Sequence, residues 1–182
     1  MSSQPLRIGV ISPVWFPVPP TGYGGIEWIV WLLADGLVDA GHDVTLFASG
    51  DSHTKAKLSS VFPTAPSARI GESLPELQHC LACYARADEF DVINDHSGLP
   101  AAVIGGLIDR PVLHTIHGPL DGEGGAIYEQ IARVAPWLAL VSLSLNQRRP
   151  RPQLPWIANC PNALPLARYS WSPKRGEYLL FL

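Results

Sequence analysis

The sequence predicts an α/β fold with a doubly wound, Rossmann-like parallel sheet. Short apolar segments rich in β-branched residues alternate along the chain with longer segments of helical periodicity. The first fifty residues already contain a strand–helix–strand unit, which implies parallel strands and a right-handed crossover. Apolar residues make up 47% of the 182 residues and charged residues only 16%, which favours a well-packed core.

The first unit begins with a buried strand over residues 6–11, which is short, mostly apolar and flanked by turn residues. Apolar residues then recur at helical spacing over residues 26–40, and Gly41 is a natural end for this helix. Glu27 lies in the first turn, where the helix dipole favours a carboxylate. Residues 43–48 form the second predicted strand.

The rest of the chain continues the alternation. Further strands are predicted over residues 58–62, where the pattern is weak, and over 91–94, 112–116, 138–143 and 156–158. Helices are predicted over residues 74–89, 100–108 and 126–134, with a short one over 144–148. Cys80 and Cys83 share one face of the first of these helices, so we expect both in the core. Residues 161–173 resemble an irregular connector, and 178–182 an apolar strand.

A proline- and glycine-rich loop joins the first strand to the first helix. Gly24 and Gly25 carry no Cβ, so a phosphate could approach the backbone closely and meet the free N–H groups of the helix N-terminus. The loop is neither the dinucleotide fingerprint, because Glu27 stands where its third glycine belongs, nor a P-loop, because no Gly-Lys-Ser/Thr follows. A helix start that needs small residues for packing is the alternative interpretation.

Two further loops are expected to meet this one. In an open α/β sheet, ligands bind beyond the carboxyl ends of the strands where the strand order reverses, and the order 3-2-1-4-5-6 brings the loops after residues 94 and 116 there. These loops carry Asp95 and His96, and His117 and Gly118. Asp95 could instead cap the next helix, and His96 could be a turn residue. His114 lies inside a strand, so a core histidine is the better interpretation.

Composition excludes several classes of protein. A net charge of -3 without a dense basic patch argues against nucleic-acid binding. No ligand spacing is diagnostic of a metal, so none is expected. Three cysteines, and a start without a basic segment followed by a long apolar one, favour a reducing, cytoplasmic compartment.

Several motifs in order resemble the N-terminal domain of family 4 glycosyltransferases, which have the GT-B fold. They are Ile-Gly-Val-Ile-Ser (8–12), Gly-Gly-Ile-Glu (24–27), Gly-His-Asp-Val-Thr-Leu-Phe-Ala (41–48), Asp-Val-Ile-Asn-Asp-His (91–96), His-Thr-Ile-His-Gly (114–118) and Val-Ser-Leu-Ser (141–144). Pro-Asn-Ala-Leu-Pro (161–165) resembles the connector into the family's second domain, with Ala163 in place of the usual glycine.

The resemblance implies a retaining sugar transferase whose substrates are a UDP- or GDP-linked sugar and an acceptor, without a required metal or other cofactor. It places Gly24 and Gly25 near the donor diphosphate and His117 near the reacting sugar, as the catalytic residue. Asp95, His96 and Gly118 are the other predicted substrate contacts. It also implies an acceptor-side domain over residues 1–160, with residues 161–182 as the linker and first strand of a donor-binding domain.

The family's nucleotide site and paired glutamates belong to that second domain, supplied in the same chain or by another, so we expect this chain alone to be inactive. Other readings stay open at this point. They are a dinucleotide-binding Rossmann enzyme, a sugar-nucleotide epimerase of the same fold, and a non-catalytic module that pairs through the apolar tail at 178–182.

Overall fold

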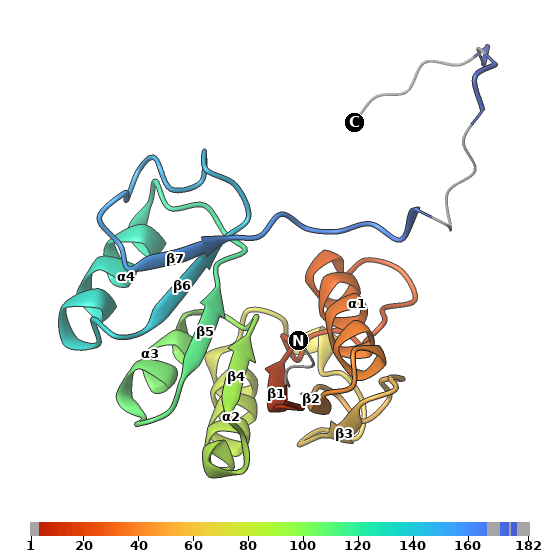
Figure 1. Cartoon of the computed structure of the whole chain (residues 1–182), viewed down its shortest axis with the longest axis horizontal. Coiled ribbons are helices and arrows are strands. Elements are labelled where there is room, and N and C mark those ends of the chain that lie inside the picture. Colours follow the sequence, from red (N-terminus) through yellow and green to blue (C-terminus); the bar gives the residue numbers. More distant parts are fainter. Residues whose placement is uncertain (1–3, 167–171, 175, 178–182) are drawn as a thin grey trace.

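The computed structural model describes residues 4–166, 172–174 and 176–177, so the strand predicted over 178–182 lies outside the described residues. The described part contains one parallel sheet of seven strands in the order β3-β2-β1-β4-β5-β6-β7 (Figure 1). The strands are β1 (Arg7–Ile11), β2 (Asp43–Phe47), β3 (Lys57–Ser59), β4 (Val92–Asp95), β5 (Val112–Thr115), β6 (Ala139–Ser142) and β7 (Trp156–Asn159). The predicted Rossmann-like fold and its strand order are therefore confirmed.

Helices cover the two faces of the sheet unequally. They are α1 (Gly25–Asp39), α2 (Ser73–Tyr84), α3 (Leu99–Leu107) and α4 (Glu123–Val134), with short 3-10 turns η1 (Ser67–Arg69) and η2 (Ala87–Glu89). Because side chains alternate along a strand, β1 sends Ile8 and Val10 to the core beneath α1 and Ile11 to the core beneath the other helices. Helix α1 thus packs on one face, and α2, α3 and α4 pack on the other.

Besides shifts of up to three residues at the ends of other elements, two element predictions differ from the structure. The helix predicted over 74–89 ends at Tyr84, because the chain must turn back for the Asp91 N–H to donate to the Arg7 carbonyl at the start of β4. The short helix predicted over 144–148 is wrong, and residues 145–150 form turns. There Ser144 and Gln147 take up backbone N–H groups with their side chains, which competes with helical hydrogen bonding.

The buried cysteines and one histidine belong to the α2 side of the core. Cys80 and Cys83 are buried in the larger apolar cluster, as predicted, and burial raises the pKa of both thiols. His79 is also buried, and its Nε2 lies 3.0 Å from the Ser12 carbonyl oxygen. Burial lowers the pKa of His79 to about 4, so this ring is neutral at pH 7. Across the described residues, no helix is both long and apolar enough to cross a bilayer.

Candidate functional site

The strand order reverses at β1, which lies between β2 and β4 in the sheet. β1 pairs with β2 on one side and with β4 on the other, and Ile11 stands level with Asp95 at the carboxyl ends. The next pair in register, Asp95 and His114, links β4 to β5. The loops after β1, β4 and β5 therefore leave the same edge of the sheet, as the sequence predicts (Figure 1).

The glycine loop reaches this edge at the N-terminus of α1. Gly24 precedes the helix with φ +147°, and a Cβ there would lie 2.7 Å from the Pro20 Cβ, so only glycine fits. Gly25 is exposed, and a Cβ on it would meet nothing within 4 Å. Among the described residues, the Gly25 and Ile26 N–H groups have no hydrogen-bond partner, so both are available to an anion.

Glu27 folds back onto the same helix terminus. Its side chain is buried, and burial raises its pKa, although a hydrogen bond with its own backbone N–H acts in the other direction. Its Oε2 would lie 3.0 Å from a Cβ added to Gly24, so this carboxylate stands beside the N-terminus of α1. The N–H groups without a partner in the described chain are those of the first two residues of the helix.

His96 and His117 form a contact pair behind the glycine loop. His96 Nδ1 lies 2.9 Å from His117 Nε2, so one ring donates its N–H to the lone pair of the other. Burial, with a smaller contribution from neighbouring histidines, lowers the pKa of His96 to about 3 and that of His117 to about 4. Both imidazoles are consequently neutral at pH 7 and can exchange hydrogen bonds with hydroxyl groups.

Asp95 lies beneath the site and has no exposed surface. Its Oδ2 accepts from the Tyr84 hydroxyl at 2.7 Å and from His114 Nδ1 at 3.2 Å, and its Oδ1 accepts from the Ser97 N–H at 2.8 Å. Burial would raise the pKa of Asp95, but these partners outweigh it and the pKa lies below its ordinary value. A carboxylate so enclosed does not contact a ligand in this conformation. It does not cap α3 either, because Gly98 precedes that helix without a side-chain cap.

His114 continues this buried network. Its Nδ1–H donates to Asp95, and its Nε2 lies 2.8 Å from the Tyr128 hydroxyl oxygen. His114 is completely buried, which confirms the prediction of a core histidine. The network ties α2 and α4 to β4 and β5 directly under the histidine pair.

Gln147 braces the loop that carries His117 and Gly118, and nothing in the sequence pointed to it. Its Nε2 donates to the carbonyl oxygens of Ile116 at 2.8 Å and Gly118 at 2.9 Å, while its Oε1 accepts from the Leu143 N–H. One side chain thus fixes the backbone on both sides of His117. Gly118 itself is exposed, and its carbonyl oxygen points to this brace.

Two cavities meet at His117. The outer cavity, about 750 Å³, lies between α1 and the chain that follows β7, and it is lined by Tyr23, Gly25, Ile26, Trp28, Ile29, Leu32, His117, Leu143 and residues 162–165. The inner cavity, about 410 Å³, is lined by Pro13, Trp15, Ile26, Glu76, residues 96–99, residues 116–119, Gly124 and Tyr128. Gly25 and His117 therefore border one space, as the sequence predicts, and His117 faces a second space as well.

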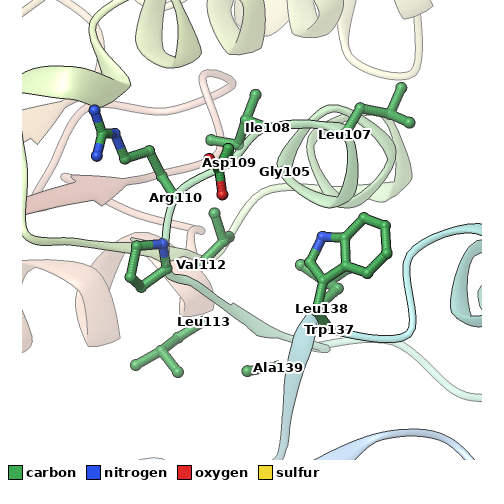
Figure 2. A pocket seen from close by; sticks show the side chains of 11 residues that line it. Gly105, Leu107, Ile108, Asp109, Arg110, Val112, Leu113, Trp137, Leu138 and Ala139 are labelled. Atoms are coloured by element: carbon green, nitrogen blue, oxygen red, sulfur yellow. The ribbon is translucent and has the colours of Figure 1, made fainter.

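A third cavity, about 640 Å³, lies at the opposite edge of the sheet. Its walls come from the end of α3 and the amino ends of β5 and β6. Figure 2 shows the Trp137 ring facing the last turn of α3, with Leu107 beyond it. It contains none of the predicted site residues. Within the part of the chain that the structure describes, no group of three or more His, Cys, Asp and Glu residues could hold a metal ion.

Fold and site together define a Rossmann-like domain with two adjoining cavities at the strand-order reversal. The family model of Glycosyltransferase Family 4 matches residues 23–164, so the chain belongs to this family. The matched segment contains every predicted site residue, including Gly25 and His117.

Comparisons with individual proteins add little to the family assignment. No curated protein matches the chain. Among solved structures, the chain is similar to one titled "Crystal structure of the C-terminal Domain of Coenzyme A biosynthesis bifunctional protein CoaBC". The TM-score is 0.47 and the sequence identity 11%, over 78% of each chain. A likeness at this level carries no argument about function.

Proposed function

We propose that this chain is the acceptor-side domain of a retaining glycosyltransferase of the GT-B type. The enzyme would move a hexose from a UDP- or GDP-linked donor to an acceptor, without a metal. One observation carries the proposal: His117 borders both the outer cavity, which Gly25 also lines, and the inner cavity. A group at this junction can touch two substrates at once.

The proposed roles follow from the geometry. The N–H groups of Gly25 and Ile26 would donate to the donor diphosphate and stabilise the charge that grows on it as the sugar leaves. Neutral His117 would accept or donate a hydrogen bond at the transferring sugar, held in orientation by His96 at 2.9 Å and by the braced loop. Asp95 would act from below as a positioning residue.

The donor's nucleotide would need a second domain over the outer cavity. We infer that residues 161–182 lead into that domain and that it can be supplied in the same chain or by a separate one. By this proposal the isolated chain transfers no sugar. A pairing of two copies of this chain, the alternative suggested by the apolar tail, would show as a doubled mass in size-exclusion chromatography with light scattering.

The test compares the chain alone with the chain joined after Leu182 to a donor-binding domain. Release of UDP or GDP from a panel of donor sugars is measured, and the anomeric configuration of the product is read by NMR. Transfer with retention in the joined protein, lost in His117→Ala and kept in the exposed-histidine control His53→Ala, is the expected result. Transfer by the isolated chain, inversion, or full activity of His117→Ala would contradict the proposal. A tight NAD titration would instead favour a dinucleotide enzyme.

A further inference from the structure

The inner cavity is lined by an acidic side chain and by no basic one, although it adjoins the proposed diphosphate position. Glu76 supplies its only charged side chain, and no Lys or Arg is among the residues that line it. Burial raises the pKa of Glu76, and the nearby carboxylate of Asp95 raises it further. The two histidines that line the cavity have lowered pKa values and add no positive charge at pH 7. The side chains that line the cavity therefore contribute no positive charge at pH 7.

The helix that opens onto the inner cavity has also lost part of its capacity for anions. α3 begins at Leu99, and the N–H of Gly98 just before it donates to Glu76 Oε1 at 3.1 Å. The next residue but one, Pro100, has no N–H to offer. A carboxylate of the protein itself thus occupies the position where an acceptor phosphate would find its backbone donor.

The remaining polar and aromatic groups suit hydroxyl groups instead. Half-buried Trp15 offers an aromatic surface on which a sugar ring can pack, and it comes from the loop after β1. Neutral imidazole nitrogens can donate or accept, and a carboxylate can accept two hydroxyl hydrogens. His96 lines the cavity, and its Nε2 is buried without a hydrogen-bond partner among the described residues.

We propose that the inner cavity binds the acceptor and selects an uncharged sugar or polyol against its phosphorylated form, with Glu76 as the determinant. This rests on the proposed function, because it names the acceptor class of the same site. The carboxylate disfavours a phosphate in two ways. It repels the like charge, and it already accepts the hydrogen bond of the Gly98 N–H. The same carboxylate accepts hydrogen bonds from the hydroxyls of the neutral compound.

The experiment measures binding to the chain without any donor. Neutral monosaccharides and polyols are titrated beside their phosphate monoesters, with glucose and glucose 6-phosphate and glycerol and glycerol 3-phosphate as matched pairs, by NMR chemical-shift perturbation at pH 7.5. Wild-type chain is expected to bind the neutral member of a pair at least tenfold more tightly. In Glu76→Gln, which keeps an acceptor for Gly98 but loses the charge, that preference should fall to about threefold or less.

Two variants keep the result interpretable. Asp109→Asn removes one carboxylate at the opposite edge of the sheet and should leave the preference unchanged. Trp15→Ala should weaken binding of the neutral compound. That result would place the compound in the inner cavity rather than at Gly25. The proposal is overturned if wild type binds no neutral member, if it binds the phosphate equally well, or if Glu76→Gln keeps the full preference. Thermal melts of each variant identify a change that comes from unfolding.

This result and the test of the proposed function can fail separately. A joined protein that transfers sugar to a phosphorylated acceptor would refute the role of Glu76 and leave the transferase proposal intact. A chain that discriminates as expected, in a joined protein without transfer, would refute the transferase proposal and leave the binding preference intact.

Discussion

Adjacent glycines at the start of α1 should respond to alanine in opposite directions. Gly24 has φ +147°, a conformation that costs an L-residue about 1–3 kcal/mol. Its new Cβ would also lie 2.7 Å from the Pro20 Cβ, well inside the ordinary carbon separation of about 3.5–4.0 Å. Relief of that overlap costs about 1–3 kcal/mol. Gly24→Ala should therefore lower the free energy of unfolding by about 3 kcal/mol.

Gly25→Ala meets neither penalty. Gly25 is helical, and nothing lies within 4 Å of the added Cβ, so the change chiefly removes conformational freedom from the unfolded chain. The free energy of unfolding should rise by about 0.4–1 kcal/mol. For a chain of this size the melting temperatures should move by about 2–4 °C per kcal/mol, downward for Gly24→Ala and upward for Gly25→Ala.

The assay pairs urea denaturation of the chain with titration of UDP and GDP into the protein joined after Leu182 to a donor-binding domain. Because Gly25 lines the outer cavity and carries one of the available N–H groups, an added methyl group there should weaken nucleotide diphosphate binding by the joined protein at least tenfold while the fold gains stability. Equal stability of both variants would refute the reading of the loop geometry. Unchanged nucleotide binding by the folded Gly25→Ala variant of the joined protein would refute the assigned anion position alone.

Two further predictions concern the buried titratable groups. The three histidines with lowered pKa values are His79, His96 and His117. Between pH 8 and pH 6 the unfolded chain takes up protons on them, near an ordinary pKa of about 6.5, while the folded chain does not. The free energy of unfolding should therefore fall by about 2.5 kcal/mol. A melting temperature that stays constant over this range would contradict those burial-driven shifts. Asp95→Asn should lower the free energy of unfolding by about 3 kcal/mol or more in urea denaturation, because it removes the central charge of the buried network. Tyr84→Phe, which removes one hydrogen bond to Asp95, should lower it by only about 1–2 kcal/mol. Equal costs would show that Asp95 is not held as the ionised centre.

The sheet could be predicted because its signals are local. Alternating apolar and β-branched residues mark each strand, and the strand–helix alternation allows few topologies. Where the prediction failed, tertiary hydrogen bonds decided the outcome. α2 ends at Tyr84 because β4 must begin beside β1, and residues 145–150 turn because Gln147 uses its side chain on backbone groups.

The site residues also fall into those that local sequence patterns predict and those that only tertiary packing determines. Gly25 and His117 were predictable because they follow strands whose carboxyl ends share one edge. The burial of Asp95 was not, because its partner Tyr84 comes from a helix whose rotation on the sheet no local pattern fixes. Glu76 gave no signal either, since a carboxylate in the first turn of a helix is ordinary until packing shows which N–H it meets.

The two helix termini at the site explain how one domain can separate two kinds of substrate. At α1, the N–H groups of Gly25 and Ile26 have no partner in the described chain, and both residues line the outer cavity. At α3, Glu76 occupies the N–H of Gly98 and places a negative charge at the inner cavity. Under the two proposals, an anion would bind on the side of His117 where backbone N–H groups are unpartnered and would be disfavoured on the side where Glu76 has taken the N–H of Gly98. A diphosphate and an uncharged hydroxyl compound would each have one place to bind, and neutral His117 would stand between them.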